Sequence, residues 1–317
     1  MTSLSPTVAG HLAQLLSITV WTSGLIVQKT LTPAASVGSI LLVQLAGAAA
    51  VLWLALALAG RLPALTRRNL VNVAWGLLAP GLVLIFGLAG AARTDGVSVS
   101  MIWGLVPLVG PVLARLILRE PLHWSFPVGG LVGLLGLIVI TLDRQRLGAS
   151  DMAGNLLVFA GVLCASISHV IGRFLNTGTV PWYQTATLQV TGAALAAGVL
   201  AALTGWRLPA SADPATLAGF LYVVFVMTVV NFLAFNFALG RIQAAWVSLY
   251  VSLAPAIGTL AAVVLLGSVV RPADALGIAI IVAGIAFPHL MRLTPGGRAH
   301  AAAASAAAPQ HRRPPRR

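Results

Sequence analysis

The sequence has little charge, few acidic residues and almost no cysteine. Only 8% of its 317 residues are charged, whereas a soluble domain carries about 25%. Cys164 is the single cysteine, so no disulfide within the chain and no cysteine-based metal site can form. With 59% hydrophobic residues, the composition indicates an all-α membrane protein that crosses the bilayer many times.

The sequence also lacks the motifs of several enzyme classes. It contains no HExxH, no Asp-rich motif and no phosphate-binding loop, so we expect no bound metal or cofactor and no ATP-driven pumping by this chain. An integral-membrane enzyme acting on a lipid would need a catalytic pair or clustered carboxylates at a membrane face, and it is the least favoured alternative.

Ten apolar runs follow one another with short loops between them, and each approaches the roughly 20 residues that a membrane-spanning helix needs. They cover 8–28, 36–59, 69–91, 97–118, 124–142, 154–175, 182–204, 215–238, 245–266 and 273–291. The first run lacks a basic flank and a cleavage context, so we expect it to be retained. The low-complexity segment 294–317 predicts a disordered basic tail.

The chain is basic, with 19 Lys+Arg against 6 Asp+Glu. Because the basic residues lie at the ends of apolar runs and in the tail, they indicate how the protein is oriented in the membrane rather than nucleic-acid binding. An even number of spans places both termini on one side. That side holds 13 basic residues and the other side 6. We therefore expect cytoplasmic termini, in the inner membrane of a bacterium.

An internal repeat appears when the sequence is shifted by 148 residues. Between Arg93 and Gly136, 10 of 44 positions match without a gap. Shared membrane composition is the alternative explanation, although matched proline and glycine are less easily explained by it than matched leucine. The paired positions include Gly24 with Gly172, Pro107 with Pro255, Gly129 with Gly277, and Gly136 with Gly284.

A repeat of five spans must place its two copies in opposite orientations. The predicted fold is therefore ten transmembrane helices in two inverted halves, residues 1–146 and 147–293. Inverted repeats are typical of secondary transporters whose substrate site lies between the halves near the midplane. This favours alternating-access transport of a small metabolite or amphipathic compound, and it favours export over import. A lipid flippase on the same fold is the main alternative.

Three segments resemble a known family. They are "PLVGPVLARLILREPLHWSFPVGGLVGLLG" (Pro107–Gly136), "PAIGTLAAVVLLGSVVRPADALGIAIIVAG" (Pro255–Gly284) and "WTSGLIVQKTLTP" (Trp21–Pro33). The chain resembles the drug/metabolite transporter superfamily, and within it the EamA-like branch, over about residues 8–291. The resemblance implies two five-helix repeats and a transporter, and it leaves the cargo open. Two positions depart from the family pattern: Ser268 replaces its second glutamate, and Thr22 replaces a glycine.

Polar residues gather on single faces of several spans, where they line either a cavity or a helix contact. On the first span this face holds Gln14, Ser17, Trp21, Gly24 and Gln28. The counterpart face of the sixth span holds His169, which could bind substrate, carry a proton or be a neutral structural residue. Further cavity candidates are Ser100 and Trp103 in the fourth span, Asn231 and Asn236 in the eighth, and Ser248 and Tyr250 in the ninth.

The remaining expectations concern hinges, packing and charge. Pro107 and Pro255 predict a kink, shared by both halves, about which each half could move. Glycines of the fifth and tenth spans predict close helix packing, with a homodimer contact as a second use. Arg115 and Arg119 predict a cytoplasmic anchor, with Glu120 paired to an arginine. All acidic residues fall at span ends or in loops, which favours a neutral, zwitterionic or amphipathic small molecule as substrate.

Overall fold

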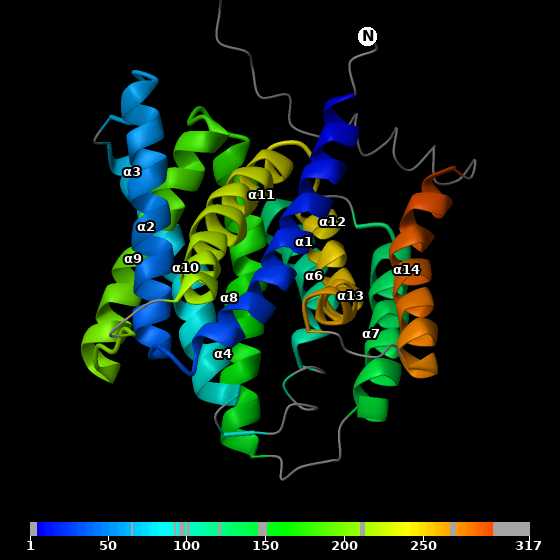
Figure 1. Ribbon diagram of the computed structural model, residues 1–317. Coiled ribbons are helices and arrows are strands. Elements are labelled where there is room, and N and C mark those ends of the chain that lie inside the picture. The colour runs from blue at the N-terminus through cyan, green and yellow to red at the C-terminus, as the bar shows by residue number, and fades with distance from the viewer. Residues whose placement is uncertain are drawn as a thin grey trace, which may run out of the picture.

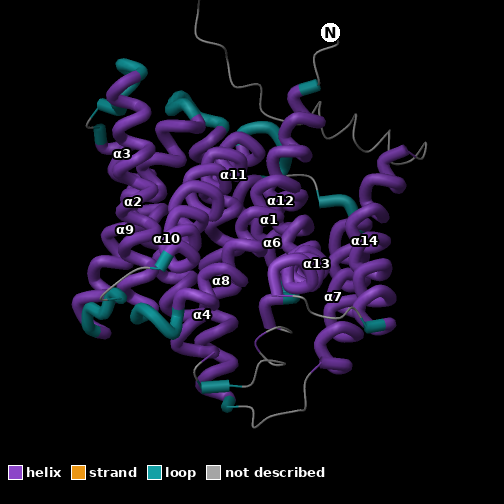
Figure 2. The backbone as a smooth tube through the Cα atoms, viewed as in Figure 1, coloured by secondary structure: helices purple, strands orange, loops and turns teal. Residues whose placement is uncertain are grey.

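The computed structural model describes residues 5–64, 66–91, 93–94, 99, 102–119, 122–144, 151–209, 213–266 and 271–293. Within them all regular structure is helical, with short connecting loops (Figure 2). The elements are α1 (Pro6–Leu31), α2 (Val37–Leu58), α3 (Arg67–Gly76), η1 (Leu77–Leu82), α4 (Val83–Ala91), α6 (Val106–Leu118), α7 (Ser125–Arg144), α8 (Met152–Asn176), α9 (Trp182–Thr204), α10 (Pro214–Leu221), η2 (Tyr222–Val230), α11 (Asn231–Leu239), α12 (Ala244–Tyr250), η3 (Val251–Leu253), α13 (Ala254–Leu266) and α14 (Pro272–Leu293).

Among the described residues, seven helical stretches are long and apolar enough to cross a membrane. They lie in α1, α2, α3 with η1 and α4, α8, α9, α10 through α11, and α14. Three shorter apolar helices, Val106–Leu118, Ser125–Val139 and Ala244–Gly258, coincide with the predicted fourth, fifth and ninth spans. The molecule is thus an all-helical membrane protein, and the count of ten spans stays a prediction.

Local sequence sets where several helices begin. The side chains of Ser36, Thr66, Asp151 and Asp213 each accept a backbone N–H from the first turn of α2, α3, α8 and α10, respectively. Such caps satisfy N–H groups that have no partner within the helix. The third span (α3, η1 and α4) and the eighth span (α10, η2 and α11) are therefore both capped, one by a threonine and the other by an aspartate.

Helix packing repeats when the two halves are exchanged. α2 packs on α9 and α7 packs on α14, and in each of these pairs the helices are counterparts at the 148-residue shift. α6, the counterpart of α13, packs on α12. α1 packs on η2 and α11 of the eighth span, and its counterpart α8 packs on η1 and α4 of the third. α7 and α14 stand side by side at one edge of the bundle (Figure 1). These neighbours reveal an internal two-fold relation between the halves.

The fifth-span helix and its counterpart run antiparallel through a glycine contact. A Cβ on Gly129 of α7 would lie 2.5 Å from the Gly284 carbonyl oxygen of α14. Further along α7, a Cβ on Gly136 would lie 2.6 Å from the carbonyl oxygen of Gly277, which comes earlier on α14. The prediction that these glycines permit close packing is confirmed within one chain. Their use in a homodimer stays a prediction.

The first-span helix and its counterpart also run in opposite directions. Gly10, near the start of α1, lies against Arg241 just after α11. Gly172, near the end of α8, lies against Leu239 at the end of α11. The start of α1 and the end of α8 are thus at the same end of the bundle. In Figure 1 α1 begins and α14 ends at this upper end, which we call the terminal end; the opposite end is called the distal end.

Two helix interruptions recur at equivalent positions. η1 covers Leu77–Leu82 and is kinked at the extended residue Ala79, and the longer, π-helical η2 contains the counterpart residues 225–230. Likewise, α6 begins at Val106 and α13 begins at its counterpart Ala254. Pro107 and Pro255 are therefore second residues of helices that follow a break. A proline there costs no hydrogen bond, because the first-turn N–H groups have no partner inside the helix.

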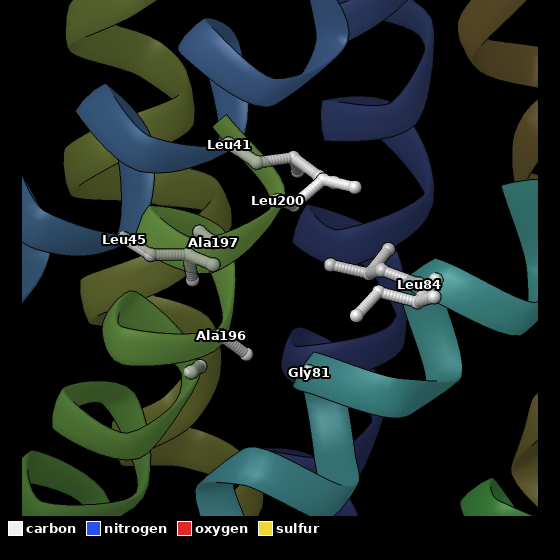
Figure 3. Close-up of a pocket in the computed structure, with 9 residues that line it drawn as sticks. Leu41, Leu45, Gly81, Leu84, Ala196, Ala197 and Leu200 are labelled. Atoms are coloured by element: carbon white, nitrogen blue, oxygen red, sulfur yellow. The ribbon is translucent and has the colours of Figure 1, made fainter. Parts of the chain in front are cut away.

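A small apolar pocket lies beside η1, between α2, α4 and α9 (Figure 3). Leu41 and Leu45 of α2, Gly81 of η1, and Ala197 and Leu200 of α9 line it. Its volume of 10 Å³ is about the space of one water molecule. Because its lining is apolar, it is a small packing void beside the kinked third span rather than a polar binding site.

Candidate functional site

A buried histidine–serine pair lies in the interior between α8 and α12. His169 Nδ1 and Ser248 Oγ are 2.8 Å apart, with 9% and 0% of the two residues exposed. The ring centroids of His169 and Phe235 are 5.8 Å apart. α6 of the first half approaches the pair at Gly110, where a Cβ would overlap the Ser248 hydroxyl. The structure thus brings two predicted site residues into direct contact.

The polar face of the first span is largely taken up by contacts with other helices. Ser17 Oγ donates to Asn231 Oδ1 of α11 at 2.6 Å. Gln28 Nε2 donates to Gln44 Oε1 of α2 at 2.6 Å. Gly24 packs against the side chain of Met227 in η2. This face could line a cavity or form a contact between helices, and in the structure Ser17, Gln28 and Gly24 form contacts between helices.

Gln14 and Trp21 occupy the rest of that face. Gln14 is 2% exposed, and its Oε1 atom accepts no hydrogen bond from the described residues. Trp21 is half-buried, and its ring packs edge to face on Phe232 with centroids 6.5 Å apart. These two side chains remain candidates for a cavity wall.

The two asparagines of the eighth span face different neighbours. Asn231 accepts the bond from Ser17 of α1, whereas Asn236 donates to Gln189 Oε1 of α9 at 2.9 Å. Asn236 also accepts from Asn176 Nδ2 of α8 at 2.8 Å. Their five-residue spacing predicts this divergence. Both amides are buried and engaged in interhelical bonds.

Tyr250 belongs to an aromatic group near the terminal end rather than to the histidine–serine pair. Its hydroxyl is 3.2 Å from His11 Nδ1 of α1. The His289 ring of α14 is 3.9 Å from the Trp246 ring and 5.1 Å from the His11 ring, centroid to centroid. His11 and His289 were not among the predicted site residues, because both lie near the ends of spans rather than deep within them.

The fourth-span candidates are only partly within the described residues. Trp103 is half-buried beside α4 and α8, where Cβ atoms on Gly87 and Gly161 would lie 3.5 and 3.6 Å from its ring. Ser100, the counterpart of Ser248, lies outside the described residues, and so does Glu120 with its predicted arginine partner. Arg115 is exposed in the last turn of α6, as an anchor requires.

The described carboxylates lie at helix starts. Asp151 caps α8 and lies 3.6 Å from Arg93, and Asp274 accepts the Arg271 backbone N–H at 2.9 Å in the first turn of α14. Asp213 caps α10, where hydrogen bonds from the Thr216 N–H and hydroxyl lower the pKa of its carboxyl. Among the described residues, no three His, Cys, Asp or Glu side chains come together as a metal site.

Three comparisons identify the relatives of this fold. Residues 8–142 and 152–288 each match the EamA-like transporter family. Over 229 residues the chain is 27% identical to "Uncharacterized transporter YyaM" of Bacillus subtilis (strain 168), covering 69% of this chain and 73% of that protein. A solved structure described as "Crystal structure of protein" superposes with a TM-score of 0.74 at 19% identity, covering 89% of this chain and 96% of that one, which supports the fold. The chain therefore belongs to the EamA-like transporter family, within the drug/metabolite transporter superfamily, and is an integral membrane transporter.

Proposed function

We propose that this protein is a secondary transporter that exports a small metabolite or amphipathic compound by alternating access. It crosses the membrane ten times as two inverted halves, residues 1–146 and 147–293, followed by the basic tail 294–317. The opposite directions of α1 and α8 carry this proposal. Inverted halves create two related gates on either side of one central site, which is what alternating access needs.

The orientation follows from charge. The terminal end carries the exposed Arg61, Arg67, Arg68, Arg115 and Arg119. Basic residues are retained on the cytoplasmic side of bacterial membranes, so we assign the terminal end to the cytoplasm and the protein to the inner membrane.

The His169–Ser248 pair is the proposed centre of the substrate site. It is polar, deeply buried, and joined by α6 of the first half at Gly110. The helix breaks before Pro107 and Pro255 lie on the spans that meet there, and freed backbone groups at such breaks bind substrates in other inverted-repeat transporters. Trp103 and Trp21 supply aromatic walls. The described carboxylates lie at helix starts, which supports a neutral or zwitterionic solute.

The proposal is tested by reconstituting the protein into liposomes loaded with a mixture of metabolites, including amino acids, sugars and nucleosides. We expect selected solutes to leave faster than from protein-free liposomes, and the His169→Ala variant to slow their release. If none leaves while a fluorescent phospholipid analogue changes leaflet, the function is lipid flipping. If neither moves, the proposal is wrong.

A further inference from the structure

A chain of side-chain amides links the distal end of α1 to the π-helical segment of the eighth span. Gln28 Nε2 donates to Gln44 Oε1 at 2.6 Å, and Gln44 Nε2 donates to Thr228 Oγ1 at 2.9 Å. Thr228 in turn donates to the Val223 carbonyl oxygen, five residues earlier in η2, at 2.7 Å. The chain thus starts in the first half and ends in a π-helical segment of the second.

A second chain links the terminal end of α8 to η1, the kinked segment of the third span. Asn176 Nδ2 donates to Asn236 Oδ1 at 2.8 Å, and Asn236 Nδ2 donates to Gln189 Oε1 at 2.9 Å. Gln189 Nε2 then donates to the Ala79 carbonyl oxygen at 3.1 Å. Ala79 has the extended angles φ −144° and ψ 122°, so its carbonyl lies outside the regular helical ladder and accepts this bond.

The two chains are related by the repeat at their two ends, whereas their central glutamines lie three residues apart at the shift and the second chain has Asn236 as an additional link. Gln28 and Asn176 occupy equivalent positions at the 148-residue shift, and η1 and η2 overlap at the same shift. Each chain runs through a glutamine of the second span of its half, Gln44 of α2 or Gln189 of α9. Since α1 and α8 run in opposite directions, the first chain lies toward the distal end and the second toward the terminal end.

The central glutamines make these bonds in the dry interior. Gln44 is 2% exposed and Gln189 is 1% exposed, and each uses its amide as acceptor and donor at once. η1, held by Gln189, is kinked at Ala79, and η2, held by Gln44, is π-helical, a geometry that occurs mostly in short stretches at functional sites. A 10 Å³ apolar pocket borders η1 at Gly81 (Figure 3).

We propose that Gln44 and Gln189 are positioning residues of the transport cycle, each holding closed the end of the molecule at which its hydrogen-bond chain lies. The proposal rests on the alternating-access function proposed above. Opening the distal end requires the first span to separate from α2 and η2, which breaks the Gln44 chain. Opening the terminal end breaks the Gln189 chain in the same way.

The test measures water access at matched positions near each end. Val27 and Leu175 are counterparts, and they directly precede Gln28 and Asn176 in the sequence. Each packs in an apolar cluster. Each is replaced by cysteine in a full-length Cys164→Ser background in proteoliposomes, and the rate of reaction with the membrane-permeant N-ethylmaleimide is measured. Loss of one interhelical bond in a membrane shifts a population about three- to tenfold. Gln44→Leu should raise labelling at position 27 by that factor, and Gln189→Leu at position 175.

The control is Thr187→Val, because Thr187 is fully buried on α9 and its hydroxyl donates to the Tyr183 carbonyl oxygen of its own helix. It should change neither rate. Thr228→Val removes the acceptor of Gln44, and Gln189→Glu removes the donor to Ala79. These variants replace a leucine variant that does not elute as a single monodisperse species in gel filtration. They should reproduce the respective shifts.

The outcomes separate the two proposals. Opposite shifts from the two glutamine variants support the positioning role, which a purely structural role would not produce. Labelling that matches the Thr187→Val control in both glutamine variants, with solute release intact, overturns the positioning role alone. Labelling that rises together at both positions in either variant shows that the ends do not alternate, and overturns the proposed function as well.

Discussion

The third and eighth spans are interrupted at the same position of the repeat, the third by a kink at Ala79 and the eighth by a π-helical stretch. Pro80 in η1 lacks an N–H and cannot take part in the helical ladder. Thr228, its counterpart in η2, instead places a hydroxyl on the Val223 carbonyl oxygen. The position of the interruption therefore belongs to the repeat, and its chemistry has diverged. The same contrast appears in the contacts around the two spans.

The third span lies much closer to α9 than the eighth span lies to α2, although the two contacts are counterparts. A Cβ on Gly76 would overlap the Gln189 carbonyl oxygen, whereas a Cβ on Gly47 of α2 would lie 3.3 Å from a methyl group of Val224. Backbone cannot give way as a side chain can. The contact of the third span with α9 therefore tolerates less added volume than the contact of the eighth span with α2.

The largest expected effect comes from this contact. Gly76→Ala should destabilise the protein by about 3 kcal/mol or more, because the added methyl forces α3 and α9 apart. Gly47→Ala should change stability by less than about 1 kcal/mol, since a helical alanine gains what the tighter contact loses. Thermal unfolding in detergent measures both. Equal effects would show that the two contacts are alike.

A second comparison sets His169 against its counterpart Trp21, since one can form hydrogen bonds through two ring nitrogens and the other through one N–H. His169→Ala should lower the rate of solute release about tenfold, the effect of losing roughly one hydrogen bond to the substrate. Cys164→Ala, on the same helix, should stay within about twofold. Release from loaded liposomes measures this, and equal, small effects would remove His169 from the site.

Thr228→Val tests the divergent chemistry of the eighth span. The variant leaves the buried Gln44 amide without its acceptor, which should cost about 1–2 kcal/mol of unfolding free energy. Thr187→Val, whose hydroxyl bonds within its own helix, should cost clearly less. If chemical or thermal unfolding ranks the two variants the other way round, the bond between Gln44 and Thr228 is not a stabilising one.

The smallest expected effect concerns the caps. The pKa of Asp213 is lowered below its ordinary 3.8, so its cap contributes fully above that pKa and is lost as pH falls through the lower, folded value. Thr66, which caps the third span, does not titrate there. Between about pH 5 and pH 2, hydrogen exchange corrected for its intrinsic rate should rise in the first turn of α10 and not of α3. An Asp213→Asn variant that keeps the same pH dependence would contradict this.

Much of the fold follows from the sequence. The apolar runs coincide with the helices of the structure, and the 148-residue shift pairs Gly136 with Gly284 and Pro107 with Pro255 before any contact is known. In the structure Gly136 packs on Gly277 and Gly284 packs on Gly129, where α7 meets α14, and the two prolines lie at matched helix starts. Close helix contacts and helix starts can be recognised in the sequence, because glycine permits the former and proline is tolerated at the latter.

The site was harder to predict. Gln28 has the same sequence pattern whether it faces a cavity or another helix, and only the 2.6 Å distance to Gln44 decides. Gln44 itself lies in a run with no polar stripe, so nothing in the sequence marked it. The π-helical geometry of η2 leaves no trace in an apolar segment without proline. These features depend on which helices meet, and that is set by packing far apart in the sequence.

The central claim is that equivalent positions of the two halves lie at opposite faces of the membrane. Arg93 and Arg241 are counterparts, each following a helix of the third or eighth span. In a Cys164→Ser background, single Arg93→Cys and Arg241→Cys variants are treated with a membrane-impermeant thiol reagent in spheroplasts. The account predicts that the Arg93→Cys variant reacts in intact spheroplasts, and that the Arg241→Cys variant reacts only after the membrane is opened. Reaction of both variants from the same side would contradict it.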